Sequence, residues 1–488
     1  MILGKGTYAE KIKKMESFKR LINLGLVAGC MAAEDLLFAF HWITRFRFSV
    51  VEELQYFRVK GHLLEIAIYV VILFAMSNMY GGMRLGYLKN SEIIFSQIFA
   101  TMITNVVIYA EVSVMTFQLF DPEYFITMTL EQCAVVIIYI YFANKLYLKL
   151  FPPRKLFLVH GDRPVENVMK KFASRADKYR VEICKGIEIG AENICGEILK
   201  EYQEGHINAV VLWDISNHER NIIFKFCYSN SIRIYIMPKI TDVILIGAEE
   251  LHVFDSPMLL TREYCLTVEQ RFVKRLIDLV CSVLLLIIAS PFMLLTAIAV
   301  KLCDGGPVFY KQVRCTIDQK EFEILKFRSM RVDAEKDGVA RLAQKNDDRI
   351  TPVGKVIRKC RLDELPQLFN ILKGDMSFIG PRPERPDIIE KYIEVMPEFV
   401  YRMKVKAGLA GFAQVYGKYN TSPYDKLKLD LTYIEKYSVW LDIKLMMLTL
   451  KVLFWPDSTE GVESEQITAL KEERVRELES TEESGKKS

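Results

Sequence analysis

Two adjacent carboxylates, Asp363 and Glu364, lie in the sequence just before Pro366. Because proline is favoured at the first position of a helix, we expect a helix to begin at Pro366 and the carboxylates to lie at its N-terminus. The partial positive charge at that end favours an ionised carboxylate, which can attack as a nucleophile or hold a metal ion. In an ordinary surface helix the same pair would simply cap the helix.

Basic residues on both sides of the pair favour phosphate chemistry. One precedes it, one follows in a Gly-Pro-Arg-Pro turn, and two lie upstream in the segment Lys-Phe-Arg-Ser-Met. Phosphoryl transfer needs neutralised phosphate oxygens, an in-line nucleophile and usually a divalent cation. Asp363 is therefore the candidate nucleophile and Mg²⁺ ligand. The candidate phosphate- or substrate-binding residues are Arg358, Arg382, Lys326, Arg328, Gln367 and Lys418.

The region 272–454 resembles the bacterial sugar transferases, also called monotopic phosphoglycosyl transferases, in their long polyprenyl glycosylphosphotransferase form. The motifs that carry the resemblance are Leu-Asp-Glu-Leu-Pro-Gln-Leu at 362–368, Lys-Phe-Arg-Ser-Met at 326–330 and Gly-Asp-Met-Ser-x-x-Gly-Pro-Arg-Pro at 374–383. A further glycine-rich motif, at 407–415, departs from the family pattern at Ala407, Ala410 and Phe412.

The resemblance implies a two-step reaction at a membrane. Asp363 would attack the sugar-linked phosphate of a UDP-sugar, release UMP and form a phosphosugar-aspartyl intermediate, with Mg²⁺ bridging the diphosphate. Undecaprenyl phosphate would then attack this intermediate, with Glu364 as general base. The product, a polyprenyl-diphosphate sugar, would open exopolysaccharide or capsule assembly. The resemblance leaves the choice of sugar open, and it allows a homodimer.

Two alternatives from other classes stay open at this point. Glu34 and Asp35 lie inside an apolar segment, where ionisable groups often mark function, so a transporter is one. In the competing interpretation, Glu34 and Asp35 face partner helices and have no transport role. A nucleotide-sensing signalling protein with a degenerate transferase domain is the other. Nucleic-acid binding is not expected, because the net charge is only +4 and there is no basic stripe interleaved with aromatic residues.

The elements that must position these residues divide into soluble and membrane segments. Apolar residues make up 51% of the chain although 26% is charged, which indicates that the two kinds are segregated. We expect a four-helix transmembrane domain at 1–152, with helices near 21–43, 63–79, 93–117 and 125–148. The distribution of lysine and arginine favours a multi-pass arrangement with both ends of this domain in the cytoplasm. The resemblance implies that the membrane is the bacterial inner membrane.

A Rossmann-like α/β domain is expected at 153–266, because short apolar strands alternate there with helical stretches. The strands are predicted near 155–160, 180–184, 209–213 and 232–237. The first strand is not followed by the G-x-G-x-x-G pattern that brings a backbone close to a pyrophosphate. We therefore expect no bound dinucleotide.

The predicted catalytic domain, 267–456, begins with the apolar segment 272–302, which contains Ser290 and Pro291 near its middle. The segment either spans the membrane or bends at this Ser-Pro and returns. Basic residues at both ends favour the bend and place the mainly helical catalytic domain on the cytoplasmic face. The resemblance agrees, since family members are held by a re-entrant helix with a Ser-Pro bend. A charged tail, 457–488, completes the expected order.

Overall fold

The computed structural model describes residues 8–44, 59–117, 119, 121–161, 165–253, 255–261, 266–331, 349–417 and 421–453. The chain forms two compact units, Met1–Met237 and Pro238–Ser488. The predicted tail at 457–488 and the candidate Lys418 lie outside the described residues. The predicted domain boundaries near 152 and 266 stay a prediction.

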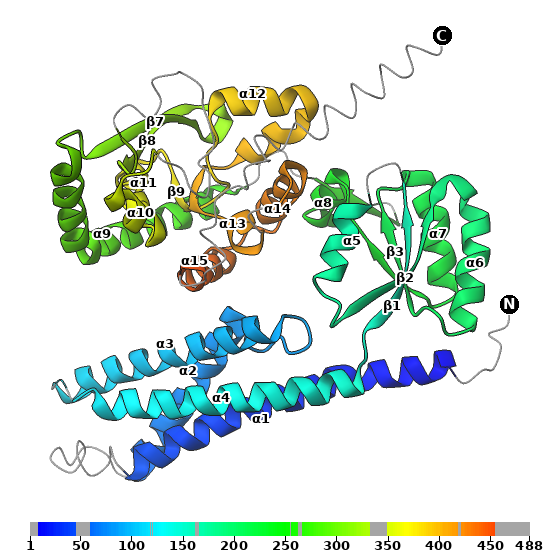
Figure 1. Cartoon of the computed structure of the whole chain (residues 1–488), viewed down its shortest axis with the longest axis horizontal. Coiled ribbons are helices and arrows are strands. Elements are labelled where there is room, and N and C mark those ends of the chain that lie inside the picture. The colour runs from blue at the N-terminus through cyan, green and yellow to red at the C-terminus, as the bar shows by residue number, and fades with distance from the viewer. Residues whose placement is uncertain are drawn as a thin grey trace. The chain divides into compact units, whose positions relative to one another are not determined.

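Four long helices open the first unit: α1 (Tyr8–His41), α2 (Val59–Tyr80), α3 (Asn90–Thr116) and α4 (Glu123–Leu150) (Figure 1). Each is long and apolar enough to cross a membrane, over Phe18–Thr44, Gly61–Tyr80, Asn90–Met115 and Glu123–Leu150. They share one apolar core, in which Phe38 of α1 stacks on Tyr69 of α2 with ring centres 3.8 Å apart. The four predicted apolar segments are therefore helices that pack on one another.

A buried polar network also joins these helices. Glu34 of α1 accepts hydrogen bonds from Gln97 Nε2 at 2.8 Å and Thr101 Oγ1 at 2.5 Å, both in α3. Gln97 also donates to Ser77 of α2 at 3.0 Å, and Gln132 of α4 donates to the backbone oxygen of Glu34 at 3.1 Å. Polar side chains bonded across apolar helices hold them together. Glu34 thus joins neighbouring helices through hydrogen bonds. This favours the interpretation in which it faces partner helices over the one in which it marks a transport pathway.

A four-stranded parallel sheet follows, in the order β2-β1-β3-β4. Its strands are β1 (Arg154–His160), β2 (Tyr179–Gly186), β3 (Ala209–Trp213) and β4 (Arg233–Ile236). Figure 1 shows α6 (Ala191–Gln203) and α7 (Asn217–Ser229) on one face and α5 (Glu166–Ala173) on the other. Helices on both faces bury the sheet, which explains the near-continuous apolar runs of β1 and β3. The predicted parallel sheet is confirmed.

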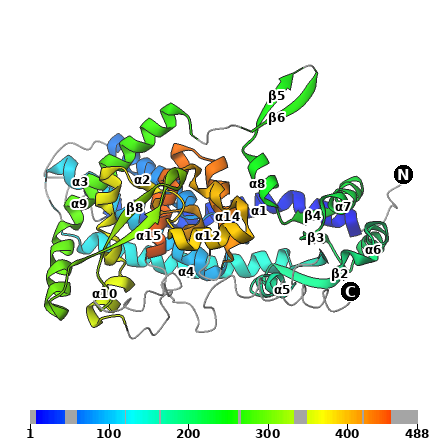
Figure 2. The same cartoon turned by 90° about the horizontal axis from the view of Figure 1, so that it is seen from above.

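The second unit opens with α8 (Ile240–Ile246) and a hairpin of β5 (Glu249–Val253) and β6 (Ser256–Leu260). The long helix α9 (Val268–Asp304) comes next and has Pro291 inside it. In Figure 2 the ribbon of α9 changes direction part-way along its length. A proline within a helix removes a hydrogen bond and bends it, so Pro291 accounts for this change of direction.

Both ends of α9 are held by the second unit. Near its start, Asp278 accepts a hydrogen bond from the backbone N–H of Phe378 at 2.8 Å. Near its end, Val300 packs in a cluster with Phe327 and Ile357. The exposed apolar residues of its middle include Val283, Leu284, Ile287, Ile288, Phe292, Leu294 and Leu295. One face of the apolar middle of α9 is thus exposed, while the other, which includes Leu285, Leu286 and Ala289, packs against the second unit.

A hairpin of β7 (Phe309–Cys315) and β8 (Glu321–Phe327) follows α9. The short strands β9 (Ser377–Ile379) and β10 (Gly408–Ala410) run parallel. They meet so closely that a Cβ at Gly408 would lie 2.1 Å from the backbone nitrogen of Gly380, which only glycine allows. This contact fixes the backbone that leads from β9 into the Gly-Pro-Arg-Pro turn.

Helices complete the second unit. They are α10 (Pro352–Lys359), α11 (Gln367–Lys373), α12 (Pro386–Val395), α13 (Phe412–Tyr416), α14 (Pro423–Glu435) and α15 (Val439–Leu453). Leu427 and Leu431 of α14 and Leu445 of α15 are buried in one core with β9 and β10. The described chain is mostly helical, with long apolar helices and a four-stranded parallel sheet, which agrees with the predicted membrane α plus α/β class.

Candidate active site

The carboxylate pair lies in a tight turn between α10 and α11. Arg361 has a left-handed backbone, with φ of 56°, and it starts the 3-10 turn Leu362–Glu364. Pro366 directly precedes α11 and is not its first residue. Asp363 and Glu364 therefore lie four and three residues before the first residue of α11. The left-handed residue reverses the chain direction after α10 and brings both carboxylates to the surface that faces β8.

Three cations hold Glu364. Arg382 Nη2 donates to Glu364 Oε1 at 3.0 Å, and Lys326 Nζ lies 3.9 Å from the same oxygen. Arg361 Nη1 lies 3.6 Å from Oε2. Burial raises the pKa of Glu364, but the charges of Arg382, Lys326 and Arg361 outweigh burial and keep the pKa well below its usual range. Glu364 is thus ionised and committed to ion pairs.

Asp363 differs from its neighbour. Among the residues that the structure describes, none forms a hydrogen bond to the Asp363 carboxylate. Burial, and then the charge of Glu364, raise the pKa of Asp363 to about 6, against the opposing charges of Lys326, Arg358 and Arg361. The raised pKa was not expected from a position next to a helix N-terminus, which favours the ionised form. Near pH 7 Asp363 is still mostly ionised, and a poorly solvated carboxylate without hydrogen bonds suits nucleophilic attack.

The site carries a surplus of positive charge. Four cations, Lys326, Arg358, Arg361 and Arg382, interact with two carboxylates. Burial lowers the pKa of Lys326 to about 8, as Arg382 and Arg314 also do, although the two carboxylates oppose this change. A group of cations that its own carboxylates do not neutralise suits a substrate with several phosphate oxygens.

Two arginines, the buried Arg402 and the half-buried Arg314, hold the turn that carries Arg382. Arg402 Nη2 donates to the backbone oxygen of Arg382 at 3.0 Å and pairs with Asp430 at 2.8 Å. Arg314 Nη1 donates to the backbone oxygen of Pro383 at 3.2 Å. Sequence reasoning missed these residues because they lie far apart along the chain. It also missed Arg361, although its spacing of three residues from Glu364 was a usable signal.

Arg328 lies elsewhere, because its guanidinium pairs with Asp304 at the end of α9. The β7–β8 ladder opposes Phe309 to Phe327, which brings the residue after β8 beside the end of α9. Arg328 is buried. In this arrangement Arg328 joins the hairpin to α9, and its role as a phosphate ligand stays a prediction.

We expect Arg328→Gln to reduce stability more than chemistry. Removing one partner of a largely buried ion pair leaves the other charge uncompensated, which should lower the free energy of unfolding by roughly 3 kcal/mol. Lys311→Gln is the matched control, because Lys311 and Glu323 form an exposed pair at 2.8 Å. It should cost under about 1 kcal/mol. Denaturation of both variants in detergent measures this, and equal losses would contradict the assignment.

The other predicted residues are placed as follows. Gln367 is buried at the start of α11. Ser290 Oγ donates to the backbone oxygen of Ile287 at 2.9 Å, one turn back in α9 and next to Pro291. Lys418 lies outside the described residues. Lys326, Arg358 and Arg382, which three separate segments supply, do come together around Asp363 and Glu364.

The fit of Mg²⁺ depends on the carboxylate without ion-pair partners. Mg²⁺ keeps several waters and usually binds through one or two carboxylates together with substrate phosphates. Asp363 offers one such carboxylate, whereas Glu364 is occupied by cations. The residues present therefore fit a metal that is bound jointly by Asp363 and a substrate diphosphate.

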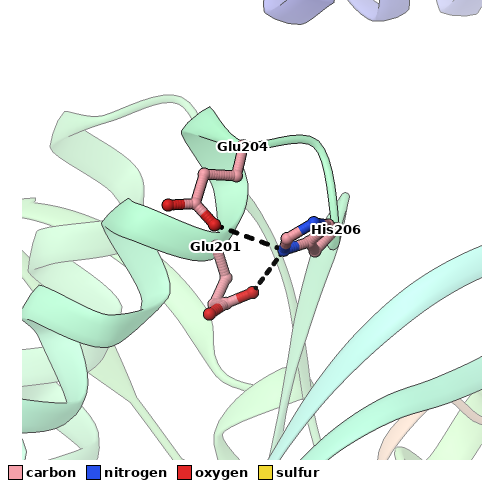
Figure 3. A group of neighbouring side chains, drawn as sticks. All are labelled: Glu201, Glu204 and His206. Carbon is pink, nitrogen blue, oxygen red and sulfur yellow. Dashed lines mark hydrogen bonds and ion pairs between the residues drawn. The ribbon is translucent and has the colours of Figure 1, made fainter.

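A different group of possible metal ligands lies in the α/β domain. Glu201, Glu204 and His206 are within ligand distance of one another (Figure 3). His206 Nδ1 lies 2.8 Å from Glu201 Oε2 and 3.4 Å from Glu204 Oε2. His206 and Glu204 are exposed, and such groups commonly pair without a metal. We interpret them as an ordinary hydrogen-bonded group at the surface.

Comparison with known proteins places the second unit in a family. The family described as bacterial sugar transferase matches residues 269–456. The UDP-N-acetylgalactosamine-undecaprenyl-phosphate N-acetylgalactosaminephosphotransferase of Aeromonas hydrophila is 43% identical over 185 residues, covering 37% of this chain and 44% of that protein. The UDP-glucose:undecaprenyl-phosphate glucose-1-phosphate transferase of Klebsiella pneumoniae is 44% identical over 182 residues, or 36% and 39% of the two chains.

A shorter relative is matched over most of its length. The UDP-glucose:undecaprenyl-phosphate glucose-1-phosphate transferase of Caulobacter vibrioides is 38% identical over 190 residues, which are 38% of this chain and 71% of that protein. The matched segment contains the carboxylate pair, the cations around it and α9. This chain therefore belongs to the bacterial sugar transferase family.

Proposed function

We propose that this protein transfers a sugar 1-phosphate from a UDP-sugar to undecaprenyl phosphate and releases UMP, the opening step of exopolysaccharide or capsule assembly. The observation that supports this proposal most strongly is the difference between the two neighbouring carboxylates. Asp363 accepts no hydrogen bond from the described residues, whereas three cations hold Glu364. The printed names of the relatives, which use UDP-sugars and undecaprenyl phosphate, support the choice of substrates.

In the first step, an Asp363 carboxylate oxygen attacks the sugar-linked phosphorus. The bond between this phosphorus and the bridging oxygen breaks, and UMP leaves with that oxygen. Lys326, Arg358 and Arg382 neutralise the charge that builds up on the phosphate oxygens. When bound, Mg²⁺ would add charge neutralisation between Asp363 and the diphosphate.

In the second step, a phosphate oxygen of the lipid carrier attacks the phosphorus of the phosphosugar-aspartyl intermediate. The Asp363 carboxylate is released, and the polyprenyl-diphosphate sugar forms. A phosphate monoester has its second pKa near 6, so most of it is already deprotonated at pH 7 and needs little help from a base. Because the pKa of Glu364 is well below its usual range, Glu364 is a weak base. We therefore assign Glu364 the task of holding Arg382, Lys326 and Arg361.

We further propose that α9 enters the membrane, bends at Ser290 and Pro291, and returns. Asp278 near its start and Val300 near its end both contact the same unit, and one face of the apolar stretch between them is exposed. A helix that crossed the membrane would place those two contacts on opposite sides, where one unit could not make both. The active site would then lie at the cytoplasmic surface, where a water-soluble donor meets a lipid acceptor.

Thiol labelling tests this arrangement. Cys303, near the end of α9, is exposed, and Glu269→Cys adds a thiol near its start. We expect an impermeant maleimide to label neither position in intact cells and both in inverted membranes, with labelled peptides located by mass spectrometry. A spanning α9 would instead give one labelled position from each side.

The activity itself is tested with a panel of UDP-sugars and the full-length protein in membranes or detergent. We expect UMP release from one or two of the sugars when undecaprenyl phosphate is present. A double displacement also predicts exchange of labelled UMP into the UDP-sugar without any acceptor. A transporter or a degenerate sensor would release no UMP from any UDP-sugar. Absence of UMP release from every UDP-sugar would therefore contradict the proposed function.

A further inference from the structure

Four basic residues come together in the first unit, Met1–Met237. Lys19 lies in α1, Arg154 is the first residue of β1, and Arg175 and Lys178 lie in the turn before β2. We call these four residues the cation cluster. The charges of Arg175, Arg154 and Lys19 all act on Lys178, so the four side chains are close in space although up to 159 positions separate them in sequence.

Aromatic rings line the cluster. Lys178 Nζ lies 4.5 Å from the ring centre of Tyr87 and 5.1 Å from that of Tyr179. Lys19 Nζ lies 5.5 Å from the ring centre of Tyr147. Ring faces attract cations but carry no net charge, so these contacts leave the positive charge of the lysines in place. Tyr87 is 56% exposed, and the four cations are themselves only partly buried.

Backbone and hydroxyl groups fix the two arginines. Arg175 Nη1 donates to the backbone oxygen of Tyr87 at 2.9 Å, and Arg154 Nη1 donates to the hydroxyl of Tyr235. Asp177 accepts hydrogen bonds from Arg175 Nε and Nη2, both at 3.1 Å. The guanidinium groups are thus held in position before any ligand arrives.

The charge of Asp177 does not balance the cluster. Burial, together with the charges of Arg175, Arg154 and Lys19, lowers the pKa of Lys178 to about 8, and Asp177 opposes only part of this change. A lysine whose neighbours repel its proton lies in a positive potential. An anion placed among these side chains would remove that repulsion.

The cluster lies where apolar helices end. Lys19 follows Phe18, the first residue of the apolar segment Phe18–Thr44, and Tyr147 is near the end of Glu123–Leu150. Tyr87 lies in the connection between α2 and α3. Lipid headgroups occupy this level of a membrane, and basic pockets between helices there bind anionic headgroups.

We propose that the cation cluster binds a phosphate-bearing anion at the membrane surface, and that the headgroup of an anionic phospholipid is its source. Guanidinium groups and lysines supply hydrogen bonds and charge to the phosphate, while the tyrosine rings lie at the boundary between lipid and water. The bound anion links the ends of α1 and α4 to β1 and the turn before β2. A soluble phosphate compound is the other source of the same chemistry.

The test compares the thermal unfolding of the full-length protein in nanodiscs of phosphatidylcholine alone and in nanodiscs that also contain phosphatidylglycerol. A ligand that binds the folded state raises the unfolding midpoint. We expect phosphatidylglycerol to raise it in the wild type, and each cation removed to weaken lipid affinity about fivefold. Inorganic phosphate and pyrophosphate, added to phosphatidylcholine nanodiscs, form the soluble arm.

The test variant is Arg175→Gln/Lys178→Gln, and the matched control is Arg180→Gln/Lys185→Gln. The control removes the same charge from β2, where Arg180 pairs with Glu182 and Lys185 with Glu197 at the surface. If the double variant does not fold, Lys178→Gln replaces it, and Lys178→Arg should keep the lipid effect.

Loss of the phosphatidylglycerol effect in the test variant alone supports the headgroup site. A wild-type response to pyrophosphate but not to the lipid supports the phosphate site and overturns its lipid source. An absent response to every probe, or equal losses in the test and control variants, would show that the cluster serves only to pack the α/β domain against the helices and would overturn the proposal.

Discussion

Asp363→Asn should lower the rate of UMP release by at least about a thousandfold, because an amide cannot attack phosphorus and no intermediate can form. Exchange of UMP into the UDP-sugar should be lost as well. Glu323→Gln is the matched control, since it also removes a carboxylate from the second unit but lies in an exposed pair with Lys311. Turnover in Asp363→Asn at the rate of the control would remove Asp363 from the mechanism.

The same substitution should stabilise the protein near pH 7. The pKa of Asp363 in the folded chain, about 6, is above the usual aspartate value of about 3.9, so the folded state binds this proton more tightly than the unfolded state. Above pH 6 the ionised carboxylate therefore costs stability, and asparagine removes that cost. The rise in unfolding midpoint should shrink as the pH falls from 6 towards 4. A lower midpoint at pH 7 would contradict this electrostatic assignment.

Glu364→Gln should lower activity on the order of a hundredfold, because Arg382, Lys326 and Arg361 lose the anion that holds them in the site. Lys326 and Arg382 would then move independently of Asp363. The combined variant Glu364→Gln/Arg382→Gln should lose less than the product of the single losses, since the two residues act as a pair. If the loss of activity in the combined variant equals the product of the two single losses, Glu364 and Arg382 have separate roles.

The pH profile of Glu364→Gln separates two roles for this residue. In the wild type we expect activity to fall as the pH drops through about 6, where Asp363 becomes protonated. The charge of Glu364 raises the pKa of Asp363, so removing this charge should move the acidic limb to lower pH. If Glu364 served only as the general base, the activity that remains in Glu364→Gln would instead rise with pH. The fall in activity near pH 6, which protonation of Asp363 causes, would then stay at the same pH.

Local sequence patterns predicted much of the site. The carboxylate pair, Lys326, Arg358 and Arg382 are each marked by a short motif, and the structure brings them together. The parallel sheet and the apolar helices also followed from periodicity and run length. These features are encoded within a few neighbouring residues, which is why one sequence was enough to find them.

Other features depend on contacts between distant segments. Arg328 is two residues from Lys326, but β8 ends between them and Asp304 takes the guanidinium. Arg402 and Asp430 support Arg382 from 20 and 48 residues away. The pKa of Asp363 depends on burial in the folded chain, which a helix-start argument does not include. Such contacts have no signature in spacing.

Mass spectrometry of the enzyme after mixing with a UDP-sugar, without lipid acceptor, and rapid acid quenching tests the central claim most directly. We predict one added hexose phosphate or N-acetylhexosamine phosphate, on the peptide that contains Asp363, with release of UMP. The adduct should disappear on addition of undecaprenyl phosphate and should not form in Asp363→Asn. UMP release with lipid present, but no adduct at Asp363 under any quench, would contradict the account.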